Sequence, residues 1–127
     1  MDVVLVEESV SESALACIAI ALRRPGTRVA EARSLKEATS FVQTDSPGPL
    51  LVILGSHALQ QPLAPFIAAI GERAAVVALA NGVSQAGRER ALRAGLRAIY
   101  ERPQEWRPFC DVLEKVLDEC LGARVRP

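Results

Sequence analysis

Leu50-Leu51-Val52-Ile53-Leu54-Gly55 is the stretch that decides the fold, because a run of apolar residues stops abruptly at a glycine. Such a run is typical of a strand that is buried on both faces of a sheet. A similar run, Val3-Val4-Leu5-Val6, comes near the start of the chain and is followed at once by Glu7-Glu8. In an open parallel sheet, ligands and chemistry gather beyond the carboxyl ends of the strands. Gly55 and the acidic pair are therefore predicted to lie at that edge.

The rest of the chain alternates between strands and helices. Further strands are predicted over residues 27–32, 75–79 and 97–100. Helices are predicted from Ser9 or Ser11 to about Arg24, from the capping box at Ser34 to near Asp45, from near Pro65 through Ile70, from Ser84 to Gly95, and from 103–106 to Gly122. Parallel strands need crossover connections and helices supply them. Five strands alternating with five helices therefore predict an α/β fold, with a parallel sheet covered on both faces.

Length and charge limit the classes of function. A chain of 127 residues fits one domain with its own core. We expect that domain to span residues 1–122, with residues 123–127 forming a tail or the start of a linker to an effector domain. Fifteen basic and fifteen acidic side chains cancel, so the domain as a whole has no field that attracts nucleic acid or an anionic membrane. Direct contact with nucleic acid is not expected.

The apolar and sulfur-containing residues indicate the compartment. The longest strongly apolar stretch, residues 14–22, is far shorter than the roughly 20 residues that span a bilayer. It also lacks the position and basic start of a signal peptide. Cys17, Cys110 and Cys120 are odd in number and show no CxxC spacing, which favours free thiols. A cytoplasmic protein without membrane contact is predicted.

Three fragments resemble the receiver domain of bacterial response regulators. They are Val4-Leu5-Val6-Glu7-Glu8, Ala91-Leu92-Arg93-Ala94-Gly95 and Arg102-Pro103. The resemblance extends from Asp2 to about Leu121 and implies a flavodoxin-like (CheY-like) sheet with strand order 2-1-3-4-5. It also implies a role in two-component signal transduction. In that family, an acidic pair after strand one and an aspartate after strand three hold a metal and accept a phosphoryl group.

The positions that carry this chemistry are changed here. The family's acidic pair, normally aspartates, falls on Glu7 and Glu8, whose longer arms would displace a metal. The phosphoacceptor falls on Gly55, which has no side chain to attack phosphorus or bind magnesium. The small hydroxyl residue after strand four falls on Ala80. The resemblance therefore implies a degenerate receiver domain, or pseudo-receiver, without catalytic residues, bound metal or cofactor.

Two further family positions lie around the last strand. The lysine before a proline falls on Arg102, a wide planar fork in place of a compact ammonium. The aromatic switch residue falls on Ile99, and Tyr100 is expected on the opposite face of the strand. For Glu7 and Glu8 two interpretations stay open. One is a weakened site for a divalent metal, and the favoured one is an ion pair between one glutamate and Arg102 with the other glutamate solvated.

Other polar residues carry weaker signals. His57 is the only histidine, and no second histidine or triad spacing accompanies it, so we expect an exposed loop residue. Ser56 has no identifiable activating base. The turn at residues 79–82 lacks the further glycines of a phosphate-cradling loop. The sequence therefore favours a protein that is not an enzyme.

The first helix is apolar all the way round, where a helix on a sheet should expose a polar stripe. If Leu15, Ala19 and Ile20 pack on the sheet, the opposite side carries exposed apolar residues, which usually mark a contact with a partner. A rotated helix with harmless exposed alanines is the alternative. Family members also often dimerise through their fourth helix, here the one predicted from Ser84 to Gly95, with strand five and helix five, using charged pairs. The alternative is that this charge-rich helix is simply solvated. The candidate interface residues are Cys17, Ile18, Ala21, Leu22, Arg88 and Arg93.

Two functions of different classes follow. The first is a pseudo-receiver that regulates by protein contact without phosphorylation, with a protein partner or a second copy in a homodimer, and that forms the N-terminal domain of a transcriptional regulator. The second is a sensor of small anions, in which the loss of two side chains around Gly55 and Ala80 leaves a pocket beside Arg102.

Overall fold

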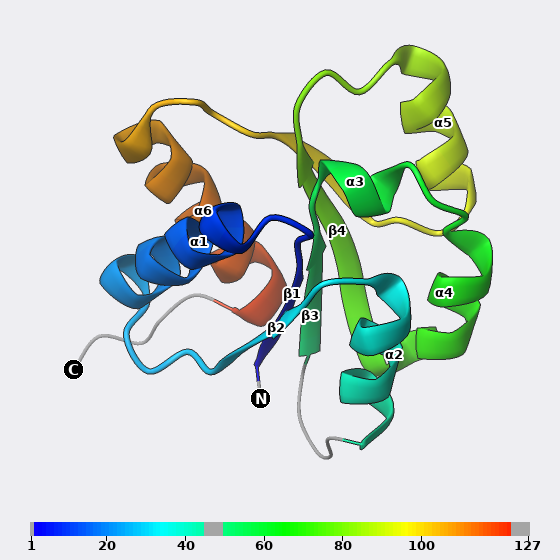
Figure 1. The fold of residues 1–127 in the computed structure, drawn as a ribbon, viewed down its shortest axis with the longest axis horizontal. Helices are drawn as coiled ribbons and strands as arrows, with labels where there is room; N and C mark the ends of the chain where they lie inside the picture. Colours follow the sequence, from blue (N-terminus) through cyan, green and yellow to red (C-terminus); the bar gives the residue numbers. More distant parts are fainter. Residues whose placement is uncertain (1, 45–49, 123–127) are drawn as a thin grey trace.

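The computed structural model describes residues 2–44 and 50–122. Five parallel strands form one sheet in the order β2-β1-β3-β4-β5 (Figure 1). The strands are β1 (Val3–Val6), β2 (Val29–Ala32), β3 (Leu50–Leu54), β4 (Ala74–Ala80) and β5 (Ala98–Glu101). The flavodoxin-like fold that the sequence predicted is confirmed.

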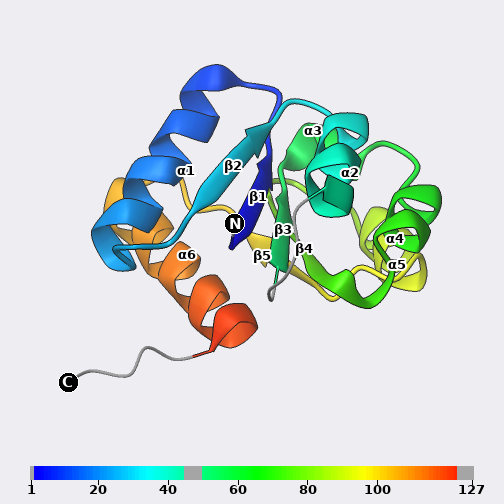
Figure 2. The same ribbon diagram turned by 90° about the horizontal axis from the view of Figure 1, so that it is seen from below.

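Helices cover both faces of the sheet. They are α1 (Val10–Arg23), α2 (Leu35–Thr44), α3 (Ser56–Leu59), α4 (Ala64–Ile70), α5 (Gln85–Arg93) and α6 (Trp106–Leu121), with a 3-10 turn at Gly71–Arg73. Helices α1 and α6 lie on one face, and α2, α4 and α5 lie on the other (Figure 2). The expected number of five helices was too low. The extra helix is α3, which begins directly after Gly55, where the extended backbone of Gly55 (φ −79°, ψ 179°) lets it act as the N-cap.

Serine side chains start three of the helices, as the sequence predicted. Ser9 Oγ accepts a hydrogen bond from Glu12 N at 3.3 Å, which decides between Ser9 and Ser11 as the cap of α1. Ser34 Oγ accepts from Glu37 N at 3.1 Å, and Ser84 Oγ accepts from Gly87 N at 3.0 Å. Each bond satisfies an amide in a first helical turn that has no partner within the helix.

Some boundaries differ from the prediction. The second strand begins at Val29 instead of Thr27, because Thr27 lies in a turn and its hydroxyl donates to Arg24 O at 2.8 Å. The fourth strand extends to Ala80, and the fifth runs one residue later than expected. The predicted end of the second helix near Asp45, the loop at 46–49 and the tail at 123–127 lie outside the described residues.

The core has one cluster on each face of the sheet. Alternate residues of β1, β3 and β4 point to opposite faces, and all of Leu51–Leu54 is buried. The spacing of apolar residues in α6 predicts a buried stripe of Phe109, Leu113, Val116, Leu117 and Cys120. The structure buries the first four together with Cys110, and Cys120 is half-buried. The thiols of Cys17, Cys110 and Cys120 are free. In the described part of the chain, no helix is long and apolar enough to cross a membrane.

Ion pairs join α1 to α6 on their shared face. Arg23 Nη1 lies 2.6 Å from Asp111 Oδ1 and 2.9 Å from Glu114 Oε1. Arg24 Nη1 lies 2.8 Å from Asp118 Oδ1, and it also donates to Gly122 O at 2.8 Å. These contacts connect the end of α1 to the middle and the C-terminal end of α6.

Helix α1 is rotated relative to the expected packing. Ser13, Ala16, Ala19 and Ile20 are buried, whereas Leu15 is 44% exposed, so its predicted contact with the sheet is wrong. Cys17, predicted to face outward, is half-buried and packs against the cluster on the α1/α6 face. Ile18 and Leu22 are exposed as predicted, by 51% and 64%. Ala14 and Ala21 are exposed too, so a continuous apolar strip remains on the outer side of α1.

Candidate functional site

The register of the sheet brings the predicted site residues to one edge. Val6 of β1 pairs with Leu54 of β3, so Glu7 and Gly55 follow side by side, with Gly55 N donating to Val6 O at 2.9 Å. At the end of β4, Ala80 O accepts from Arg102 N at 3.1 Å. The carboxyl edge that the sequence predicted therefore holds Glu7, Gly55, Ala80 and Arg102 together.

The carboxylate of Glu7 occupies the place where a side chain of residue 55 would begin. A Cβ atom built on Gly55 would lie 3.0 Å from Glu7 Cδ, 3.3 Å from Val6 O and still closer to Glu7 Oε2. Any side chain at residue 55 would therefore require the flexible end of the Glu7 side chain to move away. The Glu7 carboxylate lies in the space beside Gly55 that the sequence interpretation expected to be empty.

Arg102 closes the site from the opposite side. Its Nη1 atom lies 3.9 Å from Glu7 Oε2, and its Nη2 atom forms an ion pair with Glu12 Oε2. The guanidinium also lies over the ring of Phe109, 4.7 Å from the ring centre. Only 12% of the Glu7 side chain and 15% of the Arg102 side chain are exposed, so water screens this pair less than a surface pair.

The favoured interpretation of Glu7 and Arg102 as an ion pair agrees with this geometry. The residue that the sequence interpretation missed is Glu12, the second carboxylate on Arg102. A signal existed, because Ser9 and Glu12 have the spacing of a capping box, which places Glu12 in the first turn of α1 beside the strand ends. Glu7 is further held by Ser9 N, which donates to Glu7 Oε1 at 3.3 Å.

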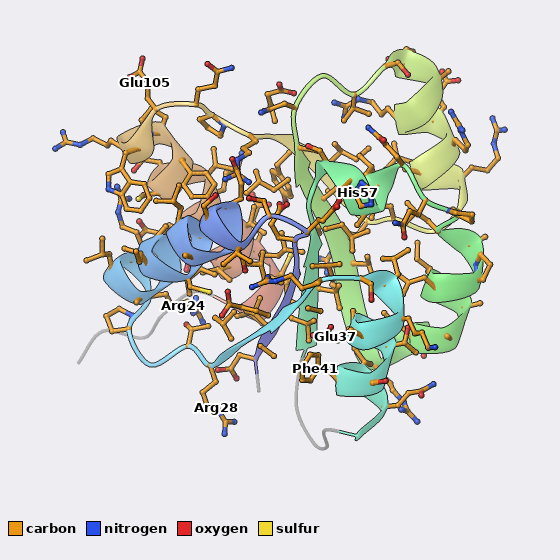
Figure 3. All side chains as sticks on the ribbon, in the orientation of Figure 1. Arg24, Arg28, Glu37, Phe41, His57 and Glu105 are labelled. Carbon is orange, nitrogen blue, oxygen red and sulfur yellow. The ribbon has the colours of Figure 1, made fainter. Side chains whose placement is uncertain are left out.

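Glu8 and His57 form a second, exposed pair at the same edge. His57 Nδ1 lies 3.0 Å from Glu8 Oε2, and His57 Nε2 lies 3.2 Å from Gln61 Nε2. His57 is 54% exposed as predicted, but it lies in helix α3 instead of a loop and has a carboxylate partner (Figure 3). Exposed pairs of this kind contribute about 0–1 kcal/mol. The neighbouring Ser56 accepts a hydrogen bond from Asn81 N at 3.3 Å.

A cavity of about 490 Å³ lies above this edge. It is lined by Glu7, Glu8, Ser9, Glu12, Ser56, His57, Asn81 and Arg102. Three carboxylates face one guanidinium there, so the lining does not favour anions. The residues also do not fit magnesium, because Gly55 offers no ligand and Glu7 already contacts Arg102. Across residues 2–44 and 50–122, no group of three or more His, Cys, Asp or Glu side chains could hold a metal ion.

The last strand shows the predicted alternation. Ile99 is half-buried against the cluster on the α2/α4/α5 face, and Tyr100 packs on the α1/α6 face. Tyr100 OH donates to Glu119 Oε2 at 2.5 Å. This hydrogen bond, together with burial, raises the pKa of Tyr100 to about 12. The only tyrosine of the chain is therefore directed away from the site.

Comparison with solved structures identifies the fold. A phosphorylated cyanobacterial phytochrome response regulator, RcpA, superposes with a TM-score of 0.78 at 15% identity, over 99% of this chain and 97% of its own. The chain has the fold of a response-regulator receiver domain. A red-light response regulator of R. palustris gives a TM-score of 0.81 at 12% identity, over 99% and 97% of the two chains.

A receiver domain from Rhodospirillum rubrum gives a TM-score of 0.72 at 15% identity, over 97% of this chain and 92% of its own. No protein-family model and no curated protein sequence matches the chain. The likeness is therefore one of fold, carried by topology and length and not by sequence.

Proposed function

We propose that the chain is a pseudo-receiver: a cytoplasmic signalling module that keeps the receiver fold, does not accept a phosphoryl group, and regulates by contact with protein. The observation that carries the proposal is the Glu7 carboxylate in the space where the side chain of residue 55 would start. Transfer of a phosphoryl group needs a nucleophilic side chain at this position, and Gly55 has none.

The surrounding positions support the same proposal. Ala80 has no hydroxyl to bind a phosphoryl oxygen, and Ile99 has no polar group to follow it. Arg102 is engaged by Glu7 and Glu12, so its charge is balanced without phosphate. We infer that the site stabilises a single conformation and that the module is not an enzyme.

Output then depends on a surface that is ready without a phosphorylation step. The outer side of α1 is the best candidate, because Ile18 and Leu22 are exposed there between exposed alanines. Of the other candidate residues, Arg93 is exposed on α5, and Arg88 is half-buried on the same helix. We propose a second copy of this chain as the occupant of the α1 surface, in a homodimer that serves as the N-terminal part of a transcriptional regulator.

The alternative function, a sensor of anions at the strand ends, has less support. Glu7 fills the space expected around Gly55, and the cavity above carries three carboxylates. An anion would have to displace Glu7 or Glu12 from Arg102 before pairing with it. This cost makes Arg102 a poor anion receptor.

The test is exposure of the protein to acetyl phosphate, or to beryllofluoride, with magnesium. We expect no change in intact mass and no change in oligomeric state. The control is a variant rebuilt toward the family pattern, with Glu7→Asp, Glu8→Asp, Gly55→Asp, Ala80→Thr and Arg102→Lys, whose modification would show that the reagents act on this scaffold. A stoichiometric, hydroxylamine-sensitive phosphate on the unmodified chain would overturn the proposal.

A further inference from the structure

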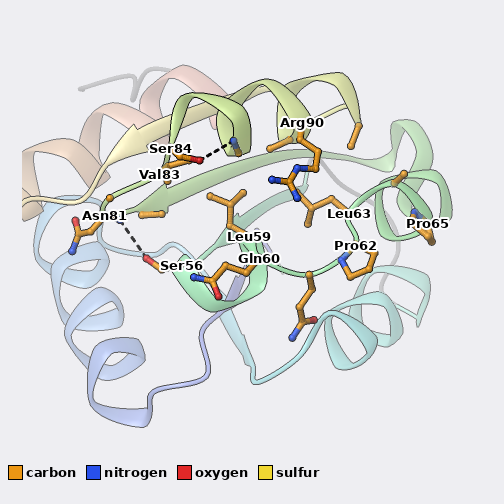
Figure 4. Close-up of a pocket in the computed structure, with 17 residues that line it drawn as sticks. Ser56, Leu59, Gln60, Pro62, Leu63, Pro65, Asn81, Val83, Ser84 and Arg90 are labelled. Carbon is orange, nitrogen blue, oxygen red and sulfur yellow. Dashed lines mark hydrogen bonds between the residues drawn. The ribbon is translucent and has the colours of Figure 1, made fainter.

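A second cavity adjoins the acidic one on the α3 side of the sheet edge. Its volume is about 600 Å³, within the range of about 300–1,000 Å³ that is typical of small-molecule sites. The cavity lies between α3, the segment that leads into α4, the turn before α5, and α5 itself (Figure 4). Ser56 and Asn81 line both cavities and are joined by a hydrogen bond, so they mark the boundary between them.

The lining of this second cavity differs in charge from that of the first. Its apolar residues are Leu59, Pro62, Leu63, Ala64, Pro65, Ala80, Val83, Ala91 and Ala94. None of the 17 lining residues is acidic, and Arg90 is the one that carries a charge at neutral pH. A largely apolar cavity with one cation is complementary to a molecule with an apolar body and one negative group.

Arg90 is placed to receive that negative group. Its side chain extends from α5 and turns its guanidinium toward Leu59 and Leu63 (Figure 4). Among the described residues no carboxylate pairs with Arg90, whereas Arg24 and Arg102 each have a carboxylate partner. A guanidinium presents two parallel N–H groups that match a carboxylate, and it does so best beside apolar surface.

The position of the cavity also matters for the fold. Helix α5 buries a single residue, Ala91, whereas α6 buries five. A molecule held between Arg90 of α5 and Leu59 and Leu63 would add contacts exactly where α5 has few. Binding would therefore stabilise α5 on the sheet.

We propose that this cavity binds a small organic acid, with its apolar body against Leu59, Leu63 and Ala91 and its carboxylate paired with Arg90. The bound acid holds α5 in place and so controls the surface that α5 presents. The proposal goes beyond the pseudo-receiver function and does not depend on it, because neither Glu7 nor Gly55 takes part.

The test uses three probes with the same ring and different charge: phenylacetate, phenylacetamide and phenethylamine. Amide proton–nitrogen correlation spectra of the full chain report where each probe binds. For a ligand of this size we expect phenylacetate to bind with a dissociation constant of about 1 mM, with the largest shifts at Gly82, Gly87 and Ala91. The amide and the amine should bind at least about tenfold more weakly, because they lack the charge-assisted hydrogen bonds to Arg90.

Two variants of α5 separate the site from general charge. Arg90→Gln should weaken phenylacetate binding by about tenfold. Arg93→Gln removes the same charge from an exposed position of α5 that does not line the cavity, and it should leave binding unchanged. Both positions are exposed, so both variants should fold, which circular dichroism checks. Phenylacetate should also slow amide hydrogen exchange in α5 of the parent protein.

Several results would overturn the proposal. They are no binding of phenylacetate, equal affinity for phenylacetamide, an Arg90→Gln variant that binds like the parent, or shifts centred on Arg102 and Glu12 instead of α5. None of these results bears on phosphorylation, so the failure of this site and the failure of the pseudo-receiver proposal are distinguishable.

Discussion

The carboxyl edge of the sheet and the outer side of α1 differ in whether their side chains have partners within the chain. At the edge, every charged group near the centre has a partner: Glu7 contacts Arg102, Arg102 contacts Glu12, and Glu8 contacts His57. On α1, Ile18 and Leu22 are more than half exposed. The charged groups of the edge are paired within the chain, whereas these apolar side chains of α1 remain exposed to solvent.

This difference bears on the pseudo-receiver proposal. A switch needs two states of similar free energy, and a site whose charges are already paired offers no evident second arrangement. An exposed apolar strip, in contrast, is stabilised when another surface covers it and removes it from water. Under the pseudo-receiver proposal, the fold serves as a scaffold for contact, and the paired charges at the carboxyl edge have a structural role.

The largest effect should come from substitutions on the outer side of α1. Ile18→Glu with Leu22→Lys should leave the protein folded and weaken self-association by more than about a hundredfold, because burial of each large aliphatic side chain contributes roughly 1.5–3 kcal/mol. Sedimentation measures the association and circular dichroism the folding. Ala68→Glu with Ala69→Lys adds the same charges to exposed positions of α4 and serves as the control.

Two outcomes would contradict this comparison. A double variant that associates like the parent would show that α1 is not the contact. A loss of several kcal/mol of stability would show that Ile18 and Leu22 are buried in solution, since an unpaired buried charge is among the most destabilising changes.

The second-largest effect should come from a substitution at the carboxyl edge of the sheet. Gly55→Asp should lower the free energy of unfolding by about 3 kcal/mol, because its Cβ would overlap the Glu7 carboxylate and a third carboxylate adds repulsion. The variant should also remain unphosphorylated by acetyl phosphate. Urea denaturation and intact mass measure the two quantities. Gly55→Asp with Glu7→Ala is the matched control, and it should recover part of the stability because the overlapping group is gone.

An efficient phosphorylation of Gly55→Asp alone would show that the edge still holds a working magnesium site. Equal stability of the single and double variants would show that Glu7 moves aside at little cost. Either result would contradict the interpretation that the Glu7 carboxylate blocks the position beside Gly55.

The sequence predicted the sheet but not the filling of its edge, and the reason is physical. The strands themselves and the edge position of Glu7 and Gly55 follow from apolar runs and chain direction, which are local or topological properties. The strand order was implied by the resemblance to receiver domains. The direction in which the Glu7 side chain turns depends on a contact with Arg102, about a hundred residues away in the chain. Helix α3 was missed because four residues are too few for a helical period to show.

The rotation of α1 was also beyond the reach of the pattern. A helix that is apolar on all sides carries no polar stripe to set its orientation. The structure decides it through the small residues Ser13 and Ala16, which face the sheet and allow close approach. Leu15 is consequently turned outward and enlarges the exposed strip.

A third, smaller effect tests the pairing at the edge. Arg102→Met should destabilise the protein by about 2 kcal/mol, because it leaves the largely buried Glu7 carboxylate without its cation. Adding Glu7→Gln to this variant should restore part of the loss, so the two changes should be non-additive in a double-mutant cycle. Additive losses, measured by urea denaturation, would mean that the 3.9 Å contact between Arg102 and Glu7 carries no coupling.

The smallest effect measures how much one hydrogen bond away from the carboxyl edge contributes to stability. Tyr100→Phe removes the 2.5 Å hydrogen bond to Glu119 and should cost about 1 kcal/mol. Because the folded pKa of Tyr100 is raised from 10.0 to about 12, the contact stabilises the fold fully below pH 10. Its contribution is then lost as the pH rises toward 12, where the unfolded chain releases the proton first. Ultraviolet titration reads this single tyrosine directly. A titration midpoint near 10 in the folded protein would show that the Glu119 contact does not persist in solution, and Tyr100→Phe should then be neutral.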